Sequence, residues 1–185
     1  MTTQSSTLDY LQPGAVTTSA SGTVIEILEN TPERIKIRRT MPENTGKVPD
    51  HFHENGVETF QVIEGSATGS VDQVECRLGP GDLLEIPVGS RHVHPFTSPG
   101  ETAVVEAWIE PRPEFAQTYF ASWLQWLKDG KTDKQDEITF LQVMALLKDG
   151  GGGTWVSGPP VPVQKVLGQV LGRVANLTGT KAIQG

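Results

Sequence analysis

Short stretches in which apolar and polar residues alternate run from about residue 23 to residue 110, and turn-forming residues separate them. A period of two places every second side chain on the same face of an extended strand, so each stretch predicts a β-strand with one buried face. Many short strands in succession predict an all-β sandwich or barrel. The strands are expected at residues 23–28, 33–40, 57–64, 67–71, 73–78, 82–86, 91–96 and 102–109.

The hydrophobic period changes to 3.6 residues after residue 113, which predicts C-terminal α-helices. The first has an aromatic stripe and ends at Gly130, the second ends at Gly150, and the third begins at Pro162. The glycines at positions 150–153 predict a flexible joint. The stripe residues are Phe115, Tyr119, Phe120, Trp123, Leu124 and Leu127 in the first helix, and Val163, Val166, Leu167, Val170, Leu171, Val174 and Leu177 in the third.

Both stripes are expected to be packing surfaces, because apolar stripes usually bury themselves in cores. The aromatic stripe is expected on the outer face of a barrel sheet; lining a ligand cavity or binding a lipid is the alternative. If the third helix is not covered within the chain, its stripe would serve as a dimer interface. The expected organisation is a flexible arm at residues 1–22, a barrel at 23–110, and a helical extension at 111–185 that packs on the barrel or at a dimer interface.

The charge, the lengths of the apolar runs and the cysteine count exclude several classes of binding partner and location. The net charge is −7 and there is no block of basic residues, so neither nucleic acid nor an anionic membrane is an expected partner. No apolar run approaches the roughly 20 residues of a membrane helix, and the start of the chain does not resemble a secretory signal. The single cysteine, Cys76, is expected to be a small buried residue in a cytoplasmic protein rather than a nucleophile.

All four histidines fall in two short stretches, as His51-Phe52-His53 and His92-Val93-His94. Residues i and i+2 of a strand share a face, so His51 and His53 can approach one ion together. Glu58 follows a turn and can supply an oxygen ligand from a neighbouring strand. Imidazole with carboxylate suits divalent iron, manganese, nickel, copper or zinc. These residues therefore predict one metal site assembled from separate strands.

At this point the chain resembles the cupin superfamily, in particular its small single-domain members. The first cupin motif is matched by His51, His53, Glu58 and Gly65, with Gly46 one residue closer to His51 than the pattern has it. The second motif is matched at four positions, and Phe96 stands where the pattern has Asn; the matching residues are Gly81, Pro87, Gly89 and His92.

The resemblance implies a double-stranded β-helix, or jelly-roll, barrel in which His51, His53, Glu58 and His92 bind the metal. His94 lies outside the motif and would share the strand face of His92, either as a proton shuttle or substrate contact, or as a hydrogen-bonded wall residue. Phe96 is expected to change packing rather than metal binding. Because cupins commonly pair, a homodimer is expected.

Three imidazoles and one carboxylate leave about two positions open on a six-coordinate ion, where substrate and O₂ can meet. The leading hypothesis is a dioxygenase-type enzyme for a small oxygenated organic molecule, with one divalent metal ion per chain, Fe(II) favoured over Mn, Ni, Cu or Zn. Glu58 and His94 are the candidate catalytic residues. The alternatives are a metal-dependent isomerase, lyase or cyclase, and a non-catalytic cupin that binds a small ligand.

Overall fold

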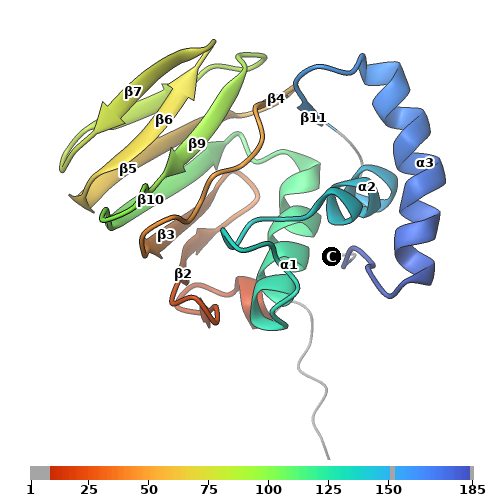
Figure 1. Cartoon of the computed structure of the whole chain (residues 1–185), viewed down its shortest axis with the longest axis horizontal. Coiled ribbons are helices and arrows are strands. Elements are labelled where there is room, and N and C mark those ends of the chain that lie inside the picture. The colour runs from red at the N-terminus through yellow and green to blue at the C-terminus, as the bar shows by residue number, and fades with distance from the viewer. Residues whose placement is uncertain (1–8, 151–152, 184–185) are drawn as a thin grey trace, which may run out of the picture.

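The computed structural model describes residues 9–150 and 153–183. Two antiparallel sheets face each other and form the barrel of Figure 1. The six-stranded sheet has the order β1 (Val16–Thr18), β2 (Val24–Asn30), β3 (Ile35–Met41), β10 (Ala103–Glu110), β5 (Val57–Gly65) and β8 (Leu83–Ile86). The five-stranded sheet has the order β11 (Thr154–Val156), β4 (His51–His53), β9 (His92–Phe96), β6 (Ala67–Val71) and β7 (Val74–Leu78). The predicted β architecture with C-terminal helices is confirmed.

Two clusters of buried side chains hold these layers together. One lies between the two sheets, where Phe60 and Val62 of β5 meet residues of both sheets. The other lies between the six-stranded sheet and the first helix, α1 (Glu114–Lys128), where Ile25 and Ile27 of β2 meet Leu124. The alternation of buried and less buried residues along β2 and β3 follows the period of two on which the strand prediction rested.

The expected N-terminal arm is largely part of the packed domain. The short helix η1 (Asp9–Leu11) buries Leu11, which is 1% exposed and belongs to the cluster beneath α1. Strand β1 pairs with β2 at the edge of the six-stranded sheet. The chain therefore joins the fold upstream of residue 23, because an edge strand and one buried leucine attach it. Residues 1–8 lie outside the described part of the chain.

The extension contains the three predicted helices and one strand that was not predicted. Figure 1 shows α1 beside the barrel, with α2 (Phe140–Asp149) and α3 (Val161–Leu177) on the side away from the sheets. Between α2 and α3, the chain returns as β11 and pairs with β4. Of the expected flexible joint, residues 151–152 lie outside the described residues. The extension thus adds a strand to the barrel.

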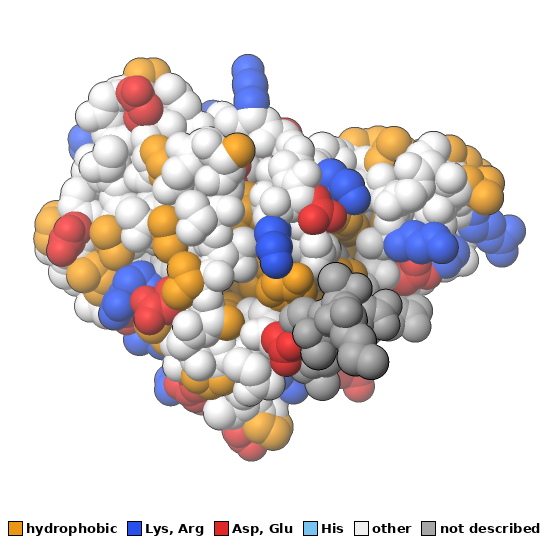
Figure 2. Space-filling view, turned by 90° about the horizontal axis from the view of Figure 1, so that it is seen from below, with side chains coloured by type: hydrophobic (Ala, Val, Ile, Leu, Met, Phe, Trp, Pro, Cys, Tyr) orange, Lys and Arg blue, Asp and Glu red, His pale blue; other side chains and the backbone are white. Residues whose placement is uncertain are grey.

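Helix α3 packs on α2 through its smallest side chains and not through its apolar stripe. Gly168, Gly172 and Ala175 are buried, and a Cβ placed on Gly172 would lie 2.7 Å from the backbone oxygen of Met144. The stripe residues Val166 and Val170, by contrast, are 63% and 57% exposed. In Figure 2 hydrophobic side chains accordingly gather on the lobe at the right, which is α3. Within the described residues, no helix is long and apolar enough to span a bilayer.

Substituting Gly172 by Ala tests this close packing. Gly→Ala in a helix interior normally stabilises by about 1 kcal/mol. Here the added methyl group meets the backbone of α2, so we expect the free energy of unfolding to fall by about 1–3 kcal/mol. Gln169→Ala, at an exposed position of the same helix, is the control and should change stability little. Denaturant unfolding measures both, and a stabilised Gly172→Ala variant would contradict the packing.

The homodimer stays a prediction, and the uncovered stripe of α3 is where we expect its interface. Two lysines at Val166 and Val170 would place charges in that interface, so the double variant should be monomeric in light scattering while the wild type has twice the chain mass. Gln169→Lys adds a charge beside the stripe and should leave the dimer intact. A monomeric wild type would refute the expectation.

Candidate metal centre

Five side chains with metal-ligand chemistry meet between the two sheets: His51, His53, Glu58, His92 and His94. One ligand atom from each of them lies within 4.8 Å of the others. The Oε2 atom of Glu58 is 3.3 Å from Nε2 of His53, 3.2 Å from Nε2 of His92 and 3.1 Å from Nε2 of His94. The structure therefore brings together all five side chains that the sequence indicated.

Strand pairing explains how residues so far apart in the sequence converge. His51 and His53 point inward from β4, and His51 pairs directly with His92 of the neighbouring strand β9. Glu58 comes from the opposite sheet, where β5 runs between β8 and β10. The carboxylate thus faces the imidazoles across the barrel, as period-two alternation on facing sheets requires.

The outer nitrogens of three rings are held by fixed partners. Nδ1 of His51 lies 2.9 Å from the carbonyl oxygen of Pro49, and Nδ1 of His92 lies 2.9 Å from that of Ser90. A carbonyl only accepts, so these two nitrogens carry the proton and donate, which leaves Nε2 as a lone pair facing inward. Nδ1 of His53 lies 2.8 Å from Oγ1 of Thr154, on β11. Such outer contacts orient metal-binding imidazoles.

The inner atoms have no hydrogen-bond partner of their own. Nε2 of His53, His92 and His94 and Oε2 of Glu58 are buried and unsatisfied among the described residues. Nε2 of His92 and Oε2 of Glu58, 3.2 Å apart, are two acceptors that face each other without a shared proton, and burial makes this arrangement costly. A divalent transition ion accepts electron pairs from this donor set, so the residues present fit such a metal.

The pKa directions agree with a site prepared for a cation. Burial lowers the pKa of His51 well below its usual value, and the neighbouring imidazoles lower it further. Burial also lowers the pKa of His94, although Glu58 acts in the opposite direction. Burial alone would raise the pKa of Glu58, but its contacts with the histidines, His94 first, hold it well below the usual range. Neutral imidazoles and an ionised carboxylate are the protonation states that bind metal.

A cavity of about 110 Å³ opens onto this cluster at the junction of the barrel with the helices. His51, His53, Glu58 and His94 border it, whereas the other walls are mostly apolar side chains of α1, α2 and their neighbours. Such a cavity, apolar with a few convergent polar groups, is typical of a small-molecule site.

The aromatic stripe of α1 is divided between two roles. Phe115, Tyr119 and Phe120 border the cavity, and the ring of Phe115 stacks on that of His53 at 5.5 Å between centroids. Trp123 is buried in the cluster against the six-stranded sheet. Ile37 of β3, in the same cluster, lies on the sheet face that also carries Glu58. Packing on the outer face of a sheet, the favoured prediction, is therefore wrong, because α1 packs against the face directed toward the metal cluster. Lining a ligand cavity, the alternative, describes Phe115, Tyr119 and Phe120.

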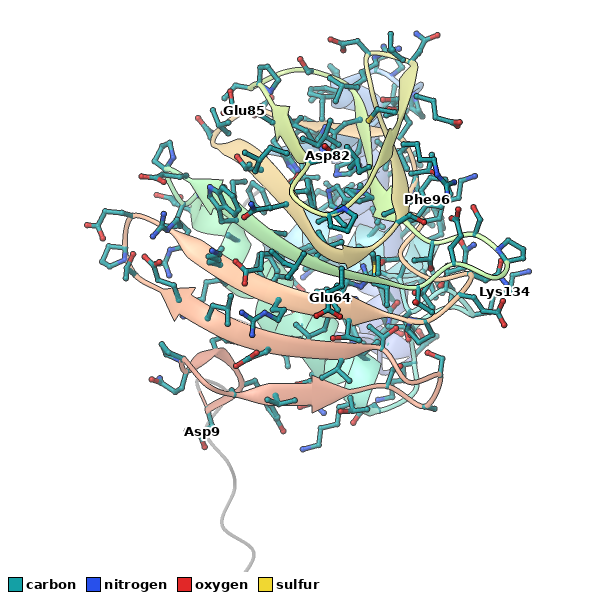
Figure 3. All side chains as sticks on the ribbon, turned by 90° about the vertical axis from the view of Figure 1, so that its left-hand side faces the viewer. Asp9, Glu64, Asp82, Glu85, Phe96 and Lys134 are labelled. Carbon is teal, nitrogen blue, oxygen red and sulfur yellow. The ribbon has the colours of Figure 1, made fainter. Side chains whose placement is uncertain are left out.

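Sequence reasoning missed Thr154 and placed Tyr119 at a ligand cavity only as the alternative to packing on a sheet. Thr154 lies on a three-residue strand that gives no periodic signal, and only its pairing opposite His53 brings it to the ring. Phe96, at the position where the cupin pattern has Asn, lies at one side of the barrel in Figure 3 and packs against Lys47, whose Nζ is 4.7 Å from the ring centroid. Phe96 is not among the five clustered residues.

Comparison with known proteins gives matches in the same region. Residues 37–109 match the family model described as Cupin domain. The quercetin 2,3-dioxygenase of Bacillus subtilis (strain 168) is 38% identical over 52 residues, which are 28% of this chain and only 15% of the relative. The chain therefore spans a small part of that enzyme.

Solved structures with a similar arrangement include the polyketide cyclase RemF from Streptomyces resistomycificus, with a TM-score of 0.43 and 24% identity over 52% of this chain and 70% of that chain. Another is the protein TT1209 from Thermus thermophilus, with a TM-score of 0.46 and 18% identity over 57% of this chain and 95% of that chain. The matched residues 37–109 contain the whole His/Glu cluster and the strands that carry it, so this part of the chain has the features of a Cupin domain.

We expect His53→Ala and Glu58→Ala each to lower metal occupancy, because each removes a donor atom from the cluster. Occupancy is measured by elemental analysis of protein purified without metal-affinity steps, and circular dichroism checks that the barrel is folded. Glu85→Ala is the matched control, because this carboxylate is exposed on the adjacent strand β8 (Figure 3). Wild-type occupancy in both site variants would show that the ligand assignment is wrong.

Proposed function

We propose that this protein is a metal-dependent dioxygenase for a small, largely apolar organic molecule that carries an oxygen function. The observation that carries the proposal is the cluster of unsatisfied imidazole and carboxylate atoms beside an apolar cavity. The similarity to a quercetin 2,3-dioxygenase, although it covers few residues, supports the same reaction class.

His51, His53, Glu58 and His92 would hold the ion, for which we favour Fe(II) over Mn, Ni, Cu or Zn. When bound, the metal would supply Lewis acidity and open positions at which a substrate oxygen and O₂ can meet. His92 is 1% exposed and borders neither of the two described cavities, which suits a ligand that touches only the metal.

The chain's own side chains would position the substrate and move its proton. His94 borders the cavity and lies beside Glu58, so its Nε2 can meet a substrate oxygen next to the ligands. Glu58 can accept the proton of a substrate hydroxyl, and His94, whose Nε2 lies 3.1 Å from Oε2 of Glu58, can hold or return it. Phe115 and Phe120 exclude water and offer apolar surface to the body of the substrate.

Oxygen dependence tests the reaction class. With a panel of flavonols, 1,3-diketones and phenols, we expect the Fe(II)-loaded protein to consume O₂ with at least one compound and to be inactive without oxygen. Replacing His94 by Gln should lower kcat by about 10²–10⁴-fold, because general acid–base catalysis contributes that much, while the metal stays bound.

Elemental analysis of the same His94→Gln preparation is the control, since lost metal would make His94 a ligand instead. Turnover of a panel compound under anaerobic conditions would contradict the oxygenase and favour an isomerase, lyase or cyclase. Binding without turnover at any oxygen level would favour a ligand-binding cupin.

A further inference from the structure

A second, smaller cavity of about 50 Å³, the inner cavity, is bordered by residues of β3, β5, β9, β10 and α1 and by none of α2. Glu58, His94, Tyr119 and Phe120 border both cavities, so the two are separated only by the candidate catalytic residues and two aromatic rings. The walls of the inner cavity are otherwise apolar, with one exception: the ion pair of Arg39 and Glu137. Neither residue of this pair belongs to the five-residue metal cluster.

Arg39 is only 8% exposed and uses just part of its hydrogen-bonding capacity. Its Nη1 donates to Oε1 of Glu137 at 2.6 Å, and one face of the guanidinium lies 5.2 Å from the ring centroid of Trp123. Nε and Nη2 are buried and have no partner among the described residues. The free edge of the group is therefore the one that carries two parallel N–H donors.

The Nε–Nη2 edge of an arginine matches the two oxygens of a carboxylate, which it binds with a pair of parallel hydrogen bonds. A buried arginine edge with no acceptor is unfavourable, because its two donors lose their hydrogen bonds to water and form no others in exchange. The position of Arg39 follows from strand geometry: it shares the inward face of β3 with Ile37 and Met41, which border the same cavity.

The charges around the inner cavity also favour an anion. A divalent ion with Glu58 leaves one positive charge at the metal centre, and Arg39 with Glu137 contributes none in total. A single negative group between the two would bring the buried region to neutrality, which lowers the cost of burying the charges.

We propose that the inner cavity is a carboxylate subsite and that the substrate is a carboxylic acid with an apolar, aromatic body. The carboxylate bonds to Nε and Nη2 of Arg39, and the body occupies the outer cavity beyond Tyr119. One water needs roughly 10–15 Å³ of such space, so about 50 Å³ accommodates a carboxylate and an adjoining carbon but not a ring. The identification of the occupant as substrate rests on the proposed function; the binding site itself does not.

The test measures binding to the metal-free full-length protein, so that the metal cannot hold the carboxylate. The probes are 3-phenylpropanoate and its uncharged amide, titrated by calorimetry at pH 7. Replacing Arg39 alone would leave Glu137 buried and unpaired, which endangers folding. The test variant is therefore Arg39→Met/Glu137→Gln, and its matched control is Glu137→Gln, which keeps the guanidinium.

We expect the wild type and Glu137→Gln to bind the acid at least tenfold more tightly than the amide, with Glu137→Gln as tight as the wild type or tighter. The double variant should lose about ten- to a hundredfold in affinity for the acid and nothing for the amide, because only the charged hydrogen bonds are removed. Equal affinity of Glu137→Gln and the double variant for the acid would overturn the proposal. Equal affinity of the wild type for acid and amide, or no binding of the acid, would overturn it as well.

Failure of the subsite and failure of the proposed function have different signatures. If the acid binds through Arg39 but no panel compound is consumed with O₂, the subsite stands and the oxygenase is refuted. If O₂ is consumed with a panel compound while replacing Arg39 leaves the affinity for the acid unchanged, the oxygenase stands and the carboxylate subsite is refuted.

Discussion

The site depends on the pairing of β4 with a strand on each side of it. This three-residue strand carries His51 and His53; it meets β9 through the His51–His92 pair and β11 along its whole length. Strand β11 belongs to the C-terminal extension and is itself held by Gln164 of α3, whose side-chain amide bonds to both the N–H and the carbonyl of Val156. The helices therefore act on the metal centre through this strand, and the extension is part of the site's framework.

Two groups of buried ionisable side chains lie at the two cavities: the His/Glu cluster and the Arg39–Glu137 pair. Burying so many ionisable groups costs stability, which the rest of the fold must offset. Their position beside cavities is the arrangement expected where local stability is given up for binding.

Helix α3 shows that a sequence pattern can predict a helix without predicting the face by which it packs. Its period of 3.6 residues predicted the helix, and the helix is there. The same pattern left open whether the Val/Leu stripe packs within the chain or at a dimer interface, and the face that packs within the chain consists of Gly168, Gly172 and Ala175. Close backbone approach to α2 requires residues without bulk, and nothing in hydrophobic periodicity reports that requirement. The stripe stays exposed within the chain, so only a second molecule can cover it.

The sequence by itself determined the longer strands, the helices and the chemistry of the metal donors, because each rests on local periodicity or on residue types at fixed spacing. The two His-x-His pairs already place their rings on common strand faces, and Glu58 follows at motif spacing. Only the tertiary structure decided that Thr154 holds a ligand ring, that Tyr119 borders two cavities, and that Arg39, with two unpartnered donors, borders the inner cavity. These three come from strands and a helix far apart in the chain, and a contact between distant segments is set by sheet order and packing, which no local pattern encodes.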